Sequence, residues 1–157
     1  MTILGVDPGT AIVGYGLIKK EGSDLKFLDY GCIRTEMDFS TAERLHLVKE
    51  DLQKIIKKHK PEQIAVEDLF FFKNLKTAIK VSQARGVILC TAAENKIPVF
   101  EYTPLQVKQA VSGYGRAEKK QVQKMVQLIL KLKEIPKPDD AADALAVAIC
   151  CAHTMKI

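Results

Sequence analysis

The chain has 157 residues, of which 47% are hydrophobic and 27% are charged, a composition typical of a globular protein in water. That length predicts one compact domain over residues 1–157, and it excludes folds that need two large domains, such as the actin-like ATPases. No apolar run approaches the roughly 20 residues of a membrane-spanning helix, and no basic leader precedes the first predicted strand. We therefore expect a cytoplasmic protein with no membrane partner. A formal charge of +5 permits a polyanionic partner without requiring one.

The four cysteines predict neither a metal site nor a redox centre. Cys32 and Cys90 stand alone, whereas Cys150 and Cys151 are adjacent near the end of an apolar helix. Because no two of them form a C-x-x-C pair, we interpret all four as structural thiols.

The first predicted element is a short buried strand over residues 2–6, which is followed by Asp7 and a Pro8–Gly9 turn. A charge in a sheet is costly unless something pairs with it, and a cation is the most useful partner for a lone carboxylate. The alternative is a surface aspartate that opens a Pro-Gly turn. The other carboxylates of the chain must distinguish the two interpretations.

Two more strands are predicted over residues 12–18 and 25–34. Short glycine-containing turns join the three strands, which is typical of an antiparallel meander.

A helix and a second buried strand come next. Ser40 and Glu43 form a capping box that starts the helix, and an apolar strand over residues 63–66 follows it and leads into Glu67. A strand, a crossover helix and a parallel strand would place Glu67 beside Asp7 at one edge of the sheet, where α/β proteins place their sites.

Three consecutive phenylalanines, Phe70, Phe71 and Phe72, follow that strand and lie close to Lys73 and Lys76. One interpretation is that the rings are apolar plugs beneath the next helix. The other is that one ring stays exposed and stacks on, or wedges between, nucleic-acid bases. The pattern alone does not separate them.

A long helix is predicted over residues 75–95, with apolar positions on more than one face. One face packs on the sheet, so the second indicates another contact, which we interpret as a homodimer. A strand over residues 97–102 follows, and Thr103 with Gln106 predicts the start of a further helix.

A glycine-rich turn over residues 112–116 ends that helix, and Glu118 opens another. Lys119 and Lys120 fall in its first turn, where the helix dipole disfavours cations. Because nothing in the local sequence accounts for these lysines, a bound phosphate is the better explanation.

The last predicted helix begins at Pro138, which suits the first helical position, and carries acids in its first two turns. Asp139 and Asp140 suit the helix dipole, but Asp143 lies further into an otherwise apolar helix. Asp140 and Asp143 share one face at a spacing of i and i+3, where two like charges repel unless a cation lies between them.

Four carboxylates therefore form the candidate site: Asp7, Glu67, Asp140 and Asp143. An all-oxygen set favours Mg²⁺ or Mn²⁺ over Zn²⁺, and four carboxylates suit a pair of ions about 3.5 to 4 Å apart. Two such ions serve an in-line displacement at phosphorus, which together with the nearby basic helices points to a phosphodiester in a nucleic acid.

Six segments in order then resemble one known family. They are I-L-G-V-D-P-G-T, E-D-L-F-F-F-K-N, Q-A-R-G, T-P-L-Q-V-K-Q-A-V, A-E-K-K-Q-V and D-A-A-D-A-L-A. Together they look like RuvC, the family of bacterial Holliday-junction resolvases, over nearly the whole chain.

The resemblance implies an α/β, ribonuclease-H-like fold, with a mixed five-stranded sheet of three antiparallel and then parallel strands flanked by helices. It implies a homodimer that uses Mg²⁺, with Mn²⁺ as a substitute, to hydrolyse two opposed strands of a four-way DNA junction. The processes would be homologous recombination and DNA repair, and the partner would be the RuvA–RuvB branch-migration complex.

The family's catalytic and metal-binding acids fall on the four carboxylates above, with Asp139 as a rival to Asp140. Its junction-facing phenylalanine falls in the run of three, with Phe70 as the first choice and Phe71 as the second. Its DNA-contacting lysines fall on Lys108 and Lys119, and the charged neighbours expected to contact DNA are Lys73, Lys76, Arg116 and Lys120.

Two other functions remain open at this point. One is a non-catalytic protein that binds DNA by its structure, and the other is a different ribonuclease-H-like nuclease, such as a Yqg-type resolvase or an enzyme acting on RNA. The intact carboxylate set argues against the first, and D-A-A-D-A-L-A argues against the second.

Overall fold

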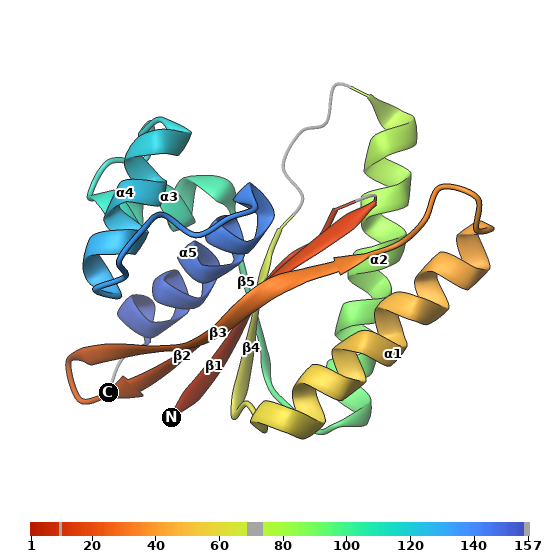
Figure 1. The fold of residues 1–157 in the computed structure, drawn as a ribbon, viewed down its shortest axis with the longest axis horizontal. Coiled ribbons are helices and arrows are strands. Elements are labelled where there is room, and N and C mark those ends of the chain that lie inside the picture. Colours follow the sequence, from red (N-terminus) through yellow and green to blue (C-terminus); the bar gives the residue numbers. More distant parts are fainter. Residues whose placement is uncertain (10, 69–73, 156–157) are drawn as a thin grey trace.

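The structure is a computed structural model that describes residues 1–9, 11–68 and 74–155. A five-stranded sheet lies at its centre, with the strand order β3-β2-β1-β4-β5 (Figure 1). The strands are β1 (Thr2–Asp7), β2 (Ile12–Glu21), β3 (Asp24–Arg34), β4 (Gln63–Glu67) and β5 (Val99–Tyr102). β1, β2 and β3 pair antiparallel, whereas β4 lies parallel to β1 and β5 parallel to β4. The predicted mixed sheet is confirmed.

Helices cover both faces of the sheet (Figure 1). One face carries α1 (Thr41–His59) and α2 (Leu75–Glu94), and the other carries α3 (Pro104–Ser112), α4 (Lys119–Ile129) and α5 (Asp139–Thr154). Among the described residues, no helix is long and apolar enough to cross a bilayer.

Alternating side chains of the strands divide the core into two layers. In β1, Leu4 and Val6 pack with α1 and α2, whereas Ile3 packs with the helices of the other face. α5 is the most deeply buried element, since residues 144–152 are all buried. Cys150 and Cys151 lie within this stretch as free thiols, in agreement with a structural role.

The predicted helix starts at Ser40 and Thr103 are confirmed. In each capping box the side-chain oxygen of the N-cap residue accepts a hydrogen bond from the third helical residue, Glu43 or Gln106, whose side chain accepts one in return. α5 differs from the prediction in one detail, because Pro138 is its N-cap residue rather than its first helical residue.

Two strand boundaries differ from the prediction by two residues or more. β2 continues to Glu21, because that residue pairs with Asp24 across a tight hairpin turn. β5 begins at Val99 rather than at residue 97, because the Ile97 N–H donates to the Ala92 carbonyl at the end of α2 and Pro98 has no N–H to donate.

Candidate active site

Two carboxyl groups meet at neighbouring strand ends. Asp7 is the last residue of β1 and Glu67 is the last residue of β4. The strands run parallel with Val6 level with Val66, so the next residue of each strand reaches the same edge of the sheet. The two carboxyl groups lie within hydrogen-bonding reach of each other, and their contact affects the pKa of both. Because a carboxylate can only accept, a hydrogen bond between them needs a proton on one of the two groups.

Two glycines allow α5 to approach the sheet at backbone distance. A Cβ at Gly5 would lie 2.1 Å from the Ala144 carbonyl oxygen, and a Cβ at Gly14 would lie 2.0 Å from the Asp140 carbonyl oxygen. Gly14 is also the residue paired with Asp7 between β1 and β2. The first turn of α5 therefore lies directly against the strand end that carries Asp7, with no side chain between them.

The start of α5 adds two carboxylates to this edge of the sheet. Asp140 and Asp143 lie one turn apart on the same side of the helix. The structure thus brings together all four predicted acids, which we call the acidic cluster: Asp7, Glu67, Asp140 and Asp143.

The acidic cluster lines two neighbouring hollows that share Glu67. The larger hollow has a volume of about 450 Å³, and its lining includes acids and the turn after β1: Asp7, Pro8, Gly9, Glu67 and Asp140. The smaller hollow has a volume of about 190 Å³, and its lining includes two acids and two lysines: Glu67, Asp143, Lys108 and Lys119.

The pKa values of three acids in the acidic cluster, Asp7, Glu67 and Asp143, are raised. Burial is the main cause for Asp7, and the charges of Glu67, Asp143 and Asp140 add to it, so that the pKa of Asp7 rises from 3.8 to about 9. Burial also raises the pKa of Glu67 and of Asp143. The cluster therefore favours any species that supplies positive charge, whether a proton or a cation.

Lys119 has protein partners outside its own helix, so a bound phosphate is not the only explanation for a lysine in the first turn of α4. Its Nζ lies 3.0 Å from Asp143 Oδ2 and 3.4 Å from Asp139 Oδ2. These partners belong to α5, so the local sequence around α4 gives no sign of them. Lys119 compensates part of the negative charge of the acidic cluster, and contact with a phosphate is not required to explain its position.

The structure separates Asp139 from Asp140. Asp139 lines neither hollow, and its Oδ1 accepts a hydrogen bond 3.0 Å long from Gln123 Nε2 on α4. Asp140 lines the larger hollow beside Asp7. This placement favours Asp140 over Asp139 as the acid that acts with Asp143.

The described residues contain no ready-made cage of three or more His, Cys, Asp or Glu side chains around an ion. Asp7 faces the carboxyl group of Glu67, and Asp143 is paired with Lys119. The donor set nevertheless fits a hard cation, because all four donors are carboxyl groups and burial raises the pKa values of Asp7, Glu67 and Asp143. A cation would take the place of the shared proton and of the lysine ammonium.

The remaining predicted DNA-contacting residues are placed less directly. Phe70, Phe71 and Lys73 lie outside the described residues. Lys76 in the first turn of α2, Arg116 in the α3–α4 connection and Lys120 at the start of α4 are all exposed, and none of the three lines either hollow.

Sequence reasoning missed one cluster next to the site. Arg85 of α2 forms ion pairs with Asp68, which directly follows Glu67, and with Glu101 of β5. A lone arginine on a helix rich in small and apolar residues, together with acids at two strand ends, was the available signal.

Comparisons with known proteins give a consistent result. Residues 3–151 match the family model described as crossover junction endodeoxyribonuclease RuvC. The chain is 56% identical to the crossover junction endodeoxyribonuclease RuvC of Halothermothrix orenii over 157 residues, which is all of this chain and 95% of the relative. It is 60% identical to the protein of that name from Heliobacterium modesticaldum over 155 residues, covering 99% of this chain and 96% of the relative.

Solved structures agree with this match. A structure of T. thermophilus RuvC in complex with Holliday junction substrate is similar with a TM-score of 0.93 and 37% identity, covering 98% of this chain and 93% of that one. The yeast mitochondrial Holliday junction resolvase Ydc2 has a TM-score of 0.69 at 15% identity, covering 96% of this chain and 78% of that one, which shows a shared fold.

Proposed function

The chain belongs to the RuvC family of crossover junction endodeoxyribonucleases, and on this premise we propose that the acidic cluster carries out its reaction. The protein is a Holliday-junction resolvase, a nuclease that hydrolyses phosphodiester bonds of junction DNA during recombination. The observation that supports the assignment of the site is the convergence of four carboxyl groups from β1, β4 and α5 on hollows bordered by Lys108 and Lys119.

Nucleases of this family depend on a divalent metal. The proposal is that the acidic cluster holds Mg²⁺, for which Mn²⁺ substitutes, and that two ions bind. When bound, such a pair supplies an activated water and stabilises the leaving 3′ oxygen of an in-line displacement. The chain's own contribution is to hold four carboxyl groups in place and to release the proton shared by Asp7 and Glu67, since metal ligands must be deprotonated.

The cations around the cluster give it access to a polyanion. Lys108 and Lys119 border the smaller hollow, Arg116 lies in the connection before α4, and Lys120 lies in the first turn of α4. In the proposed complex, Lys119 exchanges part of its pairing with Asp143 for a DNA phosphate, and Lys108 contacts the same strand.

A homodimer would place two acidic clusters on two opposed strands of one junction. Leu75 and Ile79, one turn apart on α2, have exposed fractions of 74% and 50%. Such an apolar face on a helix whose opposite side packs on α1 supports the proposal that α2 joins two copies of the chain. We also propose that a RuvA–RuvB complex supplies the junction and that the protein is cytoplasmic.

Incubation with a synthetic four-way junction and with a linear duplex of the same sequence tests the proposal. With Mg²⁺ we expect paired, symmetric nicks in the junction alone, and without Mg²⁺ we expect binding and no nicks. Binding without cleavage at every Mg²⁺ and Mn²⁺ concentration would instead indicate a non-catalytic DNA-binding protein.

Asp7→Asn assigns the site within the same assay. It removes a carboxylate and lessens the repulsion of DNA, so cleavage should be lost while junction binding is kept. Asp38→Asn, which changes an exposed acid in the loop before α1, is the matched control and should cleave normally. Normal cleavage by Asp7→Asn would show that the acidic cluster is not the active site.

A further inference from the structure

The Arg85 guanidinium ties together the ends of two neighbouring strands. Its Nη2 lies 3.0 Å from Asp68 Oδ1, and the same nitrogen forms an ion pair with Glu101 Oε2. Asp68 directly follows β4, and Glu101 belongs to β5. The Arg85 side chain therefore links the end of β5 to Asp68, the residue that directly follows Glu67 at the end of β4.

The backbone around Glu67 is bound into this arrangement. Val66 is paired with Glu101, and Glu67 is paired with Tyr102. The Asp68 N–H then donates a hydrogen bond 2.8 Å long to the Tyr102 carbonyl, which extends the parallel ladder by one residue beyond β4. Glu67 therefore lies between two fixed residues. Val66 is paired with Glu101 of β5, and Asp68 is bound both to Tyr102 and to Arg85.

Arg85 lies on the face of the sheet that carries α2, further along the helix than Thr77 and Val81, which line the larger hollow. Along β4, Ala65 packs with α5, whereas Val66 packs with α1 and α2. Because side chains alternate, Glu67 projects to the α5 side, and Glu101, level with Val66, projects toward α2. Arg85 lines neither hollow, so its contacts reach the site through the ends of β4 and β5.

The burial of Arg85 argues for a role beyond stability. Its side chain is only 19% exposed, whereas Asp68 and Glu101 are 40% and 43% exposed. No described residue accepts a hydrogen bond from its buried Nε. A buried charge is costly even when it is paired, and an apolar side chain of similar length would often be as stable.

We infer that Arg85 is a positioning residue that sets the place of Glu67 in the acidic cluster by clamping Asp68 and Glu101 at the ends of β4 and β5. The inference rests on the proposed function, because it assigns Arg85 a part in the same site. Without the guanidinium, the two clamped carboxylates repel each other, the strand ends separate and Glu67 no longer meets the other acids at the same distance.

Three variants isolate the clamp. Arg85→Met removes the charge and keeps the length, and Arg85→Lys keeps the charge but loses the planar fork that can bind two carboxylates. Lys49→Met is the matched control, because it removes another ion pair of α2, that between Lys49 Nζ and Glu94 Oε1 at 2.8 Å, far from the strand ends.

Two measurements separate positioning from folding. The first is Mn²⁺ affinity, read from the spin-resonance signal of free Mn²⁺ without DNA. The second is the single-turnover cleavage rate at saturating junction and metal, well below the melting temperature. For Arg85→Met we expect both to fall by about tenfold or more, as for other residues that orient metal ligands, with junction binding in EDTA unchanged. Arg85→Lys should have a Mn²⁺ affinity and a cleavage rate between those of Arg85→Met and wild type. Lys49→Met should match wild type in both.

A lower melting temperature for Arg85→Met, with wild-type Mn²⁺ affinity and cleavage rate, would overturn the inference and leave Arg85 a structural residue. If Arg85→Met does not fold, Asp68→Asn and Glu101→Gln can replace it, because each weakens one side of the clamp. Wild-type Mn²⁺ affinity and cleavage rate in both of these variants would also overturn the inference. Failure of the wild-type chain to cut the junction would instead contradict the proposed function, so the two failures are distinguishable.

Discussion

The carboxyl groups of Asp7 and Glu67 meet within hydrogen-bonding reach at the ends of parallel strands that are neighbours in the sheet but distant in sequence. A bond between two carboxyl groups requires a proton, and burial is the largest reason why that proton is held. Proton release and cation binding are therefore linked in this site.

Stability in EDTA should fall as the pH rises. The pKa of Asp7 is about 9 in the folded chain against 3.8 for the ordinary group, so between these values the folded state binds a proton that the unfolded state has lost. The stabilisation that this proton gives the folded state is then fully present below about pH 4, and it is lost progressively as the pH rises toward 9. Urea unfolding in EDTA across this range should show Asp7→Asn to be more stable than wild type at pH 8, by about 2 kcal/mol or more.

The matched variant for this measurement is again Asp38→Asn, which should keep the wild-type dependence on pH. Saturating Mg²⁺ should stabilise wild type more at pH 8 than at pH 6, because the ion replaces the proton. Equal pH profiles for wild type and Asp7→Asn would show that Asp7 does not hold the proton.

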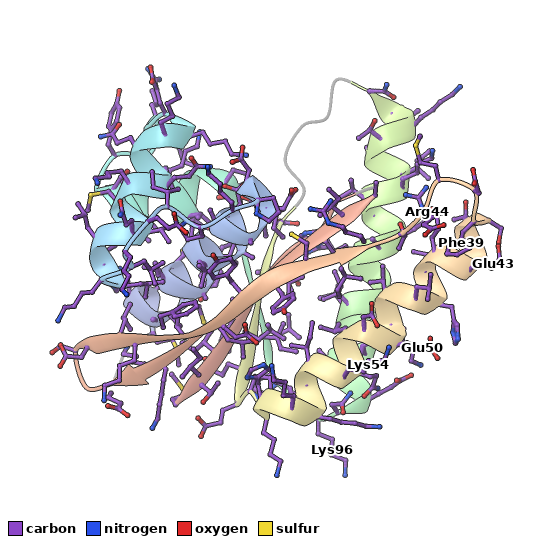
Figure 2. All side chains as sticks on the ribbon, viewed as in Figure 1. Phe39, Glu43, Arg44, Glu50, Lys54 and Lys96 are labelled. Carbon is purple, nitrogen blue, oxygen red and sulfur yellow. The ribbon has the colours of Figure 1, made fainter. Side chains whose placement is uncertain are left out.

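Lys119→Ala should weaken junction binding and lower the slope of log affinity against log salt by about one unit, because one phosphate contact is lost. Binding is measured in EDTA at several salt concentrations. Lys54→Ala serves as the control, since Lys54 projects from the outer side of α1, across the sheet from α4, and pairs with Asp51 at 2.7 Å (Figure 2). An unchanged slope would mean that Lys119 remains with Asp143 and contacts no phosphate.

Gly5→Ala should destabilise the chain by about 2 kcal/mol or more, because its Cβ would overlap the Ala144 carbonyl and push α5 from the sheet. That corresponds to a fall in melting temperature of about 4–8 °C. Gly86→Ala, where a Cβ meets no atom within 4 Å, adds the same methyl group within α2 and should instead stabilise the monomer slightly. Equal melting temperatures for the two variants would show that α5 has room to move.

Ile79→Glu should convert a dimer into monomers, because it places a charge in the exposed apolar face of α2. Sedimentation velocity at several protein concentrations measures the change. Leu105→Glu changes a residue of α3 that is 61% exposed, so it tests whether a charge at any exposed apolar position has this effect. Monomeric wild type, or a dimeric Ile79→Glu, would remove α2 as the interface.

The fold was largely predictable because its signals are local. The capping residues Ser40 and Thr103 act on their own helices, and strand alternation needs only neighbours in sequence. The meeting of Asp7 with Glu67 followed from one topological rule, that a crossover helix joins parallel strands.

The pairings around the site were not predictable, because they depend on how helices rotate against each other. Lys119 reaches Asp143 only because α4 packs against α5, and no pattern within α4 encodes that contact. Arg85 likewise meets Asp68 only once the face of α2 that packs on the sheet is known. The residues that hold strand ends therefore remained outside the sequence prediction even though the strand ends themselves did not.

The backbone contact between α5 and the sheet has a further consequence for the acids it brings together. Side chains packed between two elements can change rotamer and so allow the elements to separate slightly. At Gly5 of β1 and Gly14 of β2, no side chain of the strand lies between the sheet and α5. Mutual repulsion therefore cannot be relieved by moving Asp140 away from Asp7. The site therefore combines good packing with unfavourable charge, a conflict called local frustration that is typical of functional sites. Only an added positive charge resolves it.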